Sequence, residues 1–178
     1  RTASDSADRT VHVAALPSLQ PYIKGSDFVD HVAAALGEHH DSPTPLSVYN
    51  EAGEETRLEL LWEIPSVGYH ETYDRITTVE YGACGVVFLV LGEVHHRRIS
   101  DCARRGERVD HFLGAARGDR REMLEVKGTD RGSLPALARQ ARLQFMESPH
   151  DLPGFVGAVR FLSAEAVCER VERGEDDT

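Results

Sequence analysis

A glutamate and a lysine stand two residues apart in a short apolar stretch, REMLEVKGTD, which spans residues 121–130. On a β-strand successive side chains point to opposite faces, so Glu125 and Lys127 would lie side by side on one face, with Met123 beside them. A strand interior rarely accepts charges unless something compensates them. The pair therefore predicts a site that uses a carboxylate and an ammonium together, or else a salt-bridge set on an exposed sheet edge.

A second carboxylate precedes this pair. Asp110, in GERVDHFL, is separated from Glu125 by fourteen residues, in a D-x₁₄-E-x-K pattern. If residues 108–113 pair antiparallel with the strand that carries Glu125, Asp110 reaches the same place. The two carboxylates, with one ammonium beside them, supply hard oxygen donors at a density that suits Mg²⁺ or Mn²⁺. The alternative is that Asp110 is a solvated strand residue.

The stretch before these strands, residues 73–94, reads YDRITTVEYGACGVVFLVLGEV. It begins with a capping-box pattern, Thr77 followed three residues later by Glu80, and is then apolar on nearly every side. Its β-branched valines favour a strand, but the cap and the length predict a buried helix. Glu80 is then either a capping carboxylate or an acid that this helix presents to the site, and the two roles are compatible.

Three short strands are predicted next, at residues 97–103, 108–115 and 121–129, separated by turn-like segments. They suggest an antiparallel meander. A helix follows at 133–148, with Ser133 as its cap, then a strand at 155–163. We expect residues 164–178 to form a short acidic helix that leads into a tail. The order from residue 73 onward is then helix, three strands, helix, strand, helix.

Residues 1–72 are expected to form an N-terminal extension, packed on a core formed by residues 73–178. Its start is polar, which predicts partial disorder, and an edge strand is possible within residues 10–16. Residues 26–40 predict an amphipathic helix, and residues 46–64 predict a β-hairpin around an Asn-Glu-Ala-Gly turn. On the second strand of this hairpin the following residues alternate on one face: Leu58, Leu60, Trp62 and Ile64. The fold class is α/β, of the α+β kind.

The net charge of −10 argues against a nucleic-acid ligand, but the charges are unevenly placed. Residues 97–142 hold twelve bases and seven acids, a net charge of +5, and the remainder holds 20 − 12 = 8 bases and 30 − 7 = 23 acids, a net charge of −15. This basic region predicts contact with a polyanion, with Arg104, Arg105 and Arg108, near Asp110, as substrate-binding residues. The alternative is that the arginines are scattered over a solvated surface.

Cysteine content and hydropathy indicate the cellular compartment in which the protein is expected. The three cysteines are widely spaced and form no C-x-x-C pair, which fits a reducing cytosol and neither a disulfide framework nor a zinc site. No signal peptide is evident, and the longest apolar run is shorter than the ~18 residues that a membrane span needs. We expect a soluble, cytoplasmic protein with no membrane contact. The adjacent histidine pairs at 39–40 and 95–96 are read as solvated element ends, and His111 is expected to face away from Asp110.

The residues Glu80, Asp110, Glu125 and Lys127, on a helix and the strands after it, resemble the PD-(D/E)XK nuclease superfamily. This is the restriction-endonuclease-like fold, which archaeal Holliday-junction resolvases share. The resemblance covers roughly residues 73–163 and implies a core of helix, three strands, helix and strand. It further implies that Asp110, Glu125 and the backbone carbonyl of Val126 hold a Mg²⁺ or Mn²⁺ ion. Lys127 would orient or activate the attacking water, and Glu80 would be an extra acid.

One departure from the family concerns the second core helix. The family often has Gln-x-x-x-Tyr there, whereas this chain has Gln140 followed by Gln144. Gln140 is therefore either a helper at the site or a residue of the helix surface. The number of metal ions, one or two, stays open.

The function that the resemblance implies is metal-dependent hydrolysis of DNA phosphodiester bonds. We expect a subunit of a bacterial restriction, repair or antiviral defence system, which takes specificity from a protein partner or a homodimer mate. The alternative is a non-catalytic protein-interaction module that keeps a nuclease-like fold. The chain has no G-x-S-x-G, Walker or G-x-G-x-x-G motif, so acyl transfer, nucleotide hydrolysis and dinucleotide binding have no support.

Overall fold

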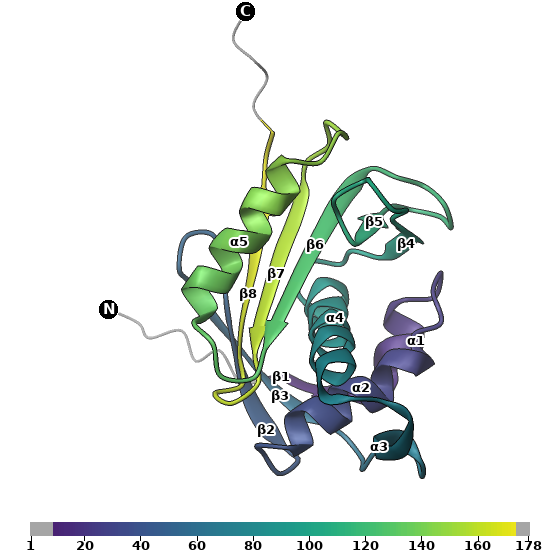
Figure 1. Cartoon of the computed structure of the whole chain (residues 1–178), viewed down its shortest axis with the longest axis vertical. Helices are drawn as coiled ribbons and strands as arrows, with labels where there is room; N and C mark the ends of the chain where they lie inside the picture. Colours follow the sequence, from purple (N-terminus) through teal and green to yellow (C-terminus); the bar gives the residue numbers. More distant parts are fainter. Residues whose placement is uncertain (1–8, 174–178) are drawn as a thin grey trace, which may run out of the picture.

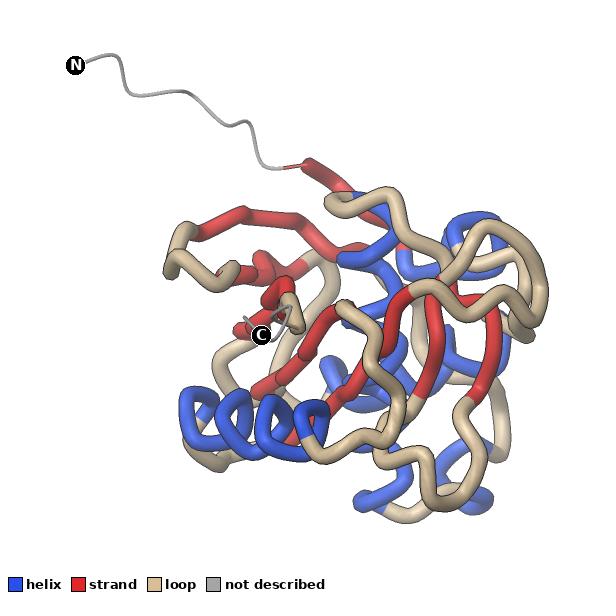
Figure 2. Tube along the Cα trace, turned by 90° about the horizontal axis from the view of Figure 1, so that it is seen from above, coloured by secondary structure: helices blue, strands red, loops and turns tan. Residues whose placement is uncertain are grey.

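The computed structural model describes residues 9–173 as a mixed α/β fold built on one eight-stranded sheet. The strand order is β1-β3-β2-β8-β7-β6-β5-β4. Helices lie on both sides of the strands (Figures 1 and 2). The disorder expected at the very start of the chain and the acidic tail expected at its end fall on residues 1–8 and 174–178, outside the described residues.

The elements have the following bounds. The strands are β1 (Arg9–His12), β2 (Thr44–Tyr49), β3 (Glu55–Leu61), β4 (Ile99–Cys102), β5 (His111–Leu113), β6 (Glu122–Thr129), β7 (Gly154–Arg160) and β8 (Glu165–Val171). The helices are α1 (Leu16–Leu19), α2 (Ser26–Gly37), α3 (Tyr69–Thr72), α4 (Arg75–Glu93) and α5 (Leu134–Met146), with a 3₁₀ turn at Val13–Ala15. The edge strand expected within residues 10–16 is thus only β1, after which the chain turns into helix.

Alternation along the central strands assigns the helices to opposite faces of the sheet. Leu124 and Val126 of β6 belong to the main core, which α4 contributes to heavily, whereas Met123 packs with Ala141 and Phe145 of α5. Successive strand residues point to opposite faces, so α4 and α5 cover opposite faces. The helices α1 and α2 pack on α4, and α5 stands apart from them across the sheet (Figure 1).

The N-terminal helix and the β2–β3 hairpin predicted from the sequence are both present. The hairpin is antiparallel, and β2 also pairs in parallel with β8, with Ser47 opposite Glu165. The hairpin therefore continues the same sheet as the later strands. Leu58 and Leu60 are buried as expected, but β3 ends at Leu61 and Ile64 is 91% exposed, so the expectation that Ile64 shares their face was wrong.

The acidic helix expected after residue 163 was also wrong, because residues 165–171 form β8. Ala166 and Cys168 are buried, while the residues between them are only partly covered. Burial of every second residue is the pattern of a strand that packs one face on the core. Pairing with β7 on one side and β2 on the other supplies the backbone hydrogen bonds that a helix would have made internally.

The buried helix predicted near residues 73–94 is present as α4, but its N-cap is Asp74. The Asp74 carboxylate accepts a hydrogen bond of 2.7 Å from the backbone N–H of Thr77. Thr77 is therefore already inside the helix, and the capping-box reading of Thr77 with Glu80 was wrong. By length and composition α4 is the one helix among the described residues that could cross a membrane, yet most of its apolar stretch is buried within the protein.

From α4 onward the elements follow one another as α4, β4, β5, β6, α5 and β7. The strands β4, β5 and β6 form the predicted antiparallel meander, and β6 and β7 are parallel across the α5 connection. Helix, three strands, helix and strand is the order expected from the sequence. This part of the chain carries every residue that the sequence singled out for chemistry.

Candidate functional site

The site is built where β5 and β6 separate. The last regular pair of this ladder is His111 with Leu124, and beyond it the backbone N–H of Asp110 donates to the Leu124 carbonyl at 3.0 Å. At the next position on this side of β6, no β5 residue pairs with Val126. Instead, the Asp110 carboxylate accepts a hydrogen bond of 2.8 Å from the Val126 N–H. The side chain of Asp110 thus replaces a backbone partner and is fixed at the fork.

The same fork orients a backbone oxygen. Carbonyl groups two residues apart along a strand point to the same side, so the Val126 carbonyl points to the side of β6 on which Leu124 meets Asp110. Asp110 and the Val126 carbonyl therefore lie on the same side of β6.

Glu125 and Lys127 lie side by side on β6, as the alternation predicted. Lys127 Nζ lies 2.8 Å from Glu125 Oε1 and donates a hydrogen bond of 2.7 Å to Gln144 Oε1 on α5. Glu125 is fully buried, and within residues 9–173 neither of its carboxyl oxygens makes a well-formed hydrogen bond. A buried carboxyl with so few partners is costly, which makes Glu125 the most unusual polar group of the fold.

Burial is the main reason why the pKa of Glu125 is raised to about 7. The neighbouring Asp110 charge raises it further, and the Lys127 ammonium acts in the opposite direction. The Asp110 carboxylate accepts from the N–H of Val126, the residue after Glu125, which puts these two acids on adjoining positions of the β5–β6 fork. The strand edge thus holds two carboxyls against one ammonium.

A cavity of about 550 Å³ opens over this cluster. Asp110, Val126 and Lys127 line it from the sheet side, and Glu80 lines it from α4. Glu125 does not line the cavity and is fully buried beside Lys127. Of the four residues expected to do chemistry, Glu80, Asp110 and Lys127 line one cavity, and Glu125 is the immediate neighbour of Lys127.

The predicted substrate-binding residues divide into two groups. Arg104 and Arg105 are exposed, line the same cavity, and form no ion pair with another described residue. Arg108 instead pairs with Glu147 at 2.8 Å and, together with Gln140, lines a separate shallow depression beside α5. Two of the three arginines thus stand at the mouth of the cavity with their charge free.

Gln140 is exposed, and it is Gln144, one turn later on α5, that contacts Lys127. The signal for Gln144 was present in the sequence. Helical spacing puts Gln144 on the same face of α5 as Leu137 and the buried Ala141 and Phe145. A polar residue on that face must meet a polar group of the sheet.

His111 was expected to face away from Asp110, and its ring lies against Phe88 of α4, with centroids 5.0 Å apart. Its side chain lines the same cavity, and its Nδ1 is buried with no hydrogen-bond partner within residues 9–173. Burial lowers the pKa of His111, and the charge of Asp110 opposes this effect.

The loop that leads into Asp110 is held by Glu107. Its carboxylate accepts hydrogen bonds from Arg120 Nη1 at 2.7 Å and from the Arg104 N–H, and it contacts His150 Nε2 at 2.9 Å. The Arg104 N–H is the main reason why the pKa of Glu107 falls to about 2. These contacts fix the segment that presents Arg104 and Arg105 to the cavity.

Comparison with models of protein families gave no match, and neither did comparison with curated proteins or with solved structures.

The donor groups can be tested against the needs of a divalent cation. Within residues 9–173 no group of three His, Cys, Asp or Glu side chains is placed to hold a metal ion. Mg²⁺, however, is usually held by only one or two carboxylates, together with waters and substrate oxygens. Asp110, Glu125 and the Val126 carbonyl supply oxygen donors of the kind and number that this smaller requirement calls for. Oε1 of Glu125 faces the Lys127 ammonium, whereas Oε2 has no hydrogen-bond partner among residues 9–173 and is available as a ligand atom.

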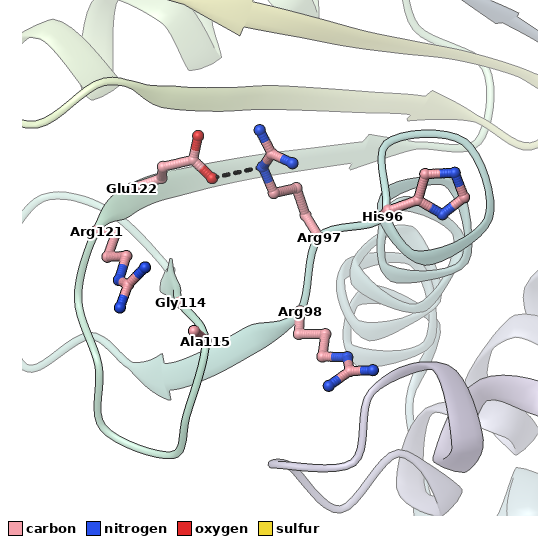
Figure 3. Close-up of a pocket in the computed structure, with 7 residues that line it drawn as sticks. All are labelled: His96, Arg97, Arg98, Gly114, Ala115, Arg121 and Glu122. Atoms are coloured by element: carbon pink, nitrogen blue, oxygen red, sulfur yellow. Dashed lines mark hydrogen bonds and ion pairs between the residues drawn. The ribbon is translucent and has the colours of Figure 1, made fainter.

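Another cavity, of about 510 Å³, lies at the other end of the β5–β6 hairpin (Figure 3). It is rich in arginine, but Arg97 pairs with Glu122 at 2.9 Å and Arg121 pairs with Asp119 at 2.7 Å. Arg98 lies over the Tyr22 ring at 5.9 Å. Most of the positive charge there is compensated, in contrast to the mouth of the Asp110 cavity.

The adjacent histidines at 39 and 40 are fixed by structural contacts. His39 Nε2 lies 2.9 Å from Asp130 Oδ1, which also pairs with Arg75, and His40 Nε2 lies 2.7 Å from the Phe161 carbonyl. They tie the end of α2 to the ends of β6 and β7. Their role is in the fold, away from the Asp110 cavity.

Proposed function

We propose that this protein is a metal-dependent nuclease that hydrolyses phosphodiester bonds of DNA. One observation carries the proposal: the Asp110 carboxylate is fixed on the Val126 N–H, next along β6 to the buried Glu125, whose carboxyl has the Lys127 ammonium 2.8 Å away. Two neighbouring carboxyl groups at a buried strand edge lower the stability of the fold, because burial and like charge both disfavour their ionised forms. A cation that binds there during catalysis supplies the reason.

The order of the elements supports the same proposal. The sequence α4, β4, β5, β6, α5, β7, with an antiparallel β4–β6 meander and parallel β6 and β7, agrees with a restriction-endonuclease-like core. The acidic pair lies at the β5–β6 fork, and Glu80 faces the cavity from the first core helix. The β2–β3 hairpin and β8 then extend this core. This is the arrangement to which the resemblance to the PD-(D/E)XK nucleases points.

The residues have distinct roles in the proposed reaction. In hydrolysis a water oxygen forms a bond to phosphorus, the bond to one ester oxygen breaks, and the water proton passes to a base while the leaving oxygen takes up a proton. Asp110, Glu125 and the Val126 carbonyl would hold a Mg²⁺ or Mn²⁺ ion, which acidifies water and neutralises the added charge on phosphorus. Lys127, held between Glu125 and Gln144, orients the water and stabilises that charge.

Arg104 and Arg105 bind the polyanion. Both stand at the cavity mouth without a carboxylate partner among the described residues, so their charge is available for phosphate oxygens. The chain as a whole is acidic, which limits binding to this basic region. We further propose that the protein acts with a partner or as a homodimer in bacterial restriction, repair or antiviral defence.

The test is cleavage of plasmid and linear DNA in Mg²⁺ or Mn²⁺ by the native chain and by two variants, Asp110→Asn and Lys127→Ala. We expect both variants to lose at least about 100-fold in rate, as removal of one transition-state-stabilising group does elsewhere. The matched control is Arg139→Ala, which removes an exposed charge from α5 and should leave the rate unchanged. Equal inactivity of the native chain and both variants would favour a non-catalytic interaction module instead.

A further inference from the structure

A cluster of aromatic side chains adjoins the cavity on the α4 side. Tyr81, the residue after Glu80, lines the cavity together with Asp110 and Lys127, and it is 46% exposed. Tyr73, just before α4, is 41% exposed. Two half-exposed tyrosines near a charged cavity are unusual in a fold whose phenylalanines are mostly buried.

The Tyr81 ring is supported from below by His31 of α2. The two rings are stacked, with centroids 5.1 Å apart and an interplanar angle of 28°. Tyr73 also contacts His31, at 4.7 Å and nearly edge-on, and Phe28 meets Tyr81 at 6.1 Å. His31 covers one side of the Tyr81 ring, so the exposed surface lies on the side away from α2.

A chain of hydrogen bonds fixes this support. His31 is 5% exposed, and its Nδ1 lies 2.6 Å from the Tyr69 hydroxyl. The Tyr69 hydroxyl lies 3.0 Å from Thr78 Oγ1, and Thr78 Oγ1 donates to the Asp74 carbonyl at 2.9 Å. The supporting ring is therefore held from α2, α3 and α4 together. By contrast, the Tyr81 hydroxyl makes no hydrogen bond to another described residue, so what Tyr81 offers is the ring.

We propose that Tyr81 is a stacking platform for an unpaired nucleobase next to the phosphate that the Asp110 cavity binds. This inference rests on the nuclease function proposed above and deepens it, since it makes single-stranded or frayed nucleic acid the substrate. In a duplex each base face is covered by its neighbours in the stack, so a side-chain ring can stack only on a base that has left it. Arg104 and Arg105 line the same cavity and hold the backbone of that strand.

The test measures binding with cleavage switched off. A fluorescently labelled oligothymidine of about 12 nucleotides, within the usual span of single-strand sites, and a duplex of equal length are titrated with the full chain in EDTA. Tyr81→Ala should weaken oligothymidine binding about 5- to 150-fold, the equivalent of the usual ~1–3 kcal/mol for one stacked base. Tyr81→Phe keeps the ring and should bind like the native chain.

Two controls separate stacking from damage to the fold. Tyr49→Ala removes a tyrosine from β2, away from the cavity, and should leave oligothymidine binding unchanged. With 2-aminopurine placed in the oligonucleotide, the native chain and Tyr81→Phe should quench its fluorescence, whereas Tyr81→Ala should not.

The outcomes distinguish this inference from the nuclease proposal. If Tyr81→Ala binds oligothymidine as tightly as the native chain does while DNA cleavage is intact, the stacking platform is overturned and the nuclease stands. Equal weakening of single-stranded and duplex binding by Tyr81→Ala also overturns it, because the ring would then not select an unpaired base. If the native chain neither binds nor cleaves any nucleic acid, both proposals fail.

Discussion

Glu125 is the residue on which the chemistry depends. It is fully buried, and the ammonium beside it, that of Lys127, also donates a hydrogen bond to Gln144. When no metal ion is bound, the ionised form of this buried carboxyl lowers the stability of the folded protein. The metal-free protein should therefore be less stable at higher pH.

This can be measured as the pH dependence of unfolding. A carboxyl with a raised pKa binds its proton more tightly in the folded chain than in the unfolded one, so stability falls as pH rises from about 4.5 to about 7 and stays lower above. Glu125→Gln removes this penalty. In EDTA, urea unfolding should give the variant an advantage of up to roughly 3 kcal/mol above pH 7, at about 1.36 kcal/mol per pKa unit, and little or none near pH 4.5.

The opposite result is equally clear. If Glu125→Gln is less stable than the native chain at high pH, the Glu125–Lys127 ion pair outweighs the burial cost, and the buried carboxyl is a structural salt bridge.

At the residue scale, sequence patterns placed Glu125 and Lys127 on one face because strand alternation depends only on local geometry. Asp110 joined them once antiparallel pairing was assumed. Helical spacing indicated which face of α5 carries Gln144, but its contact with Lys127 depends on how α5 is rotated against the sheet.

At the element scale, α4 is the helix that brings Glu80 and Tyr81 to the cavity. Close packing on α2 sets its position, since a Cβ at Gly85 of α4 would fall on Val32 Cγ2 of α2. The sequence predicted α4 from its length and apolar content. It did not predict β8, because an acidic, alanine-containing segment has helical propensity, and only pairing with β2 and β7 makes it a strand.

Alanine substitutions in two helical glycines test this packing. Gly85→Ala should cost about 1–3 kcal/mol through overpacking, more than the up to about 1 kcal/mol that alanine gains in a helix. Gly37→Ala is the matched control on α2, because its nearest new neighbour, Trp62 Nε1, would be 3.7 Å away. Denaturant unfolding should show Gly85→Ala destabilised and Gly37→Ala neutral or slightly stabilised. Equal effects of the two changes would mean that α2 and α4 are free to shift apart.

At the scale of the whole molecule, charge is segregated along the chain, with a net charge of +5 in residues 97–142 and −15 elsewhere. Part of the positive charge is neutralised by ion pairs such as Arg108 with Glu147 and Arg142 with Glu169. The sequence could not tell paired arginines from free ones, because their partners are distant along the chain. Arg104 and Arg105 remain free beside the cavity.

Binding to DNA should therefore depend on salt through a few arginines. The logarithm of the binding constant should fall linearly with the logarithm of salt concentration, and Arg105→Ala should reduce that slope by about 1. Arg139→Ala, on the exposed side of α5, should leave the slope unchanged. If both variants reduce it equally, the arginines act as a diffuse field and the cavity mouth is not the contact surface.

The most direct test of the central claim is a crystal structure with Mn²⁺, read from the anomalous signal of the ion. The account predicts one ion at the β5–β6 fork, about 2 Å from carboxylate oxygens of Asp110 and Glu125 and from the Val126 carbonyl, as hard cations of this size are held. In Asp110→Asn crystals grown the same way the signal should disappear. An Mn²⁺ ion bound elsewhere, or the absence of any ion at the fork at saturating concentration, would contradict the account.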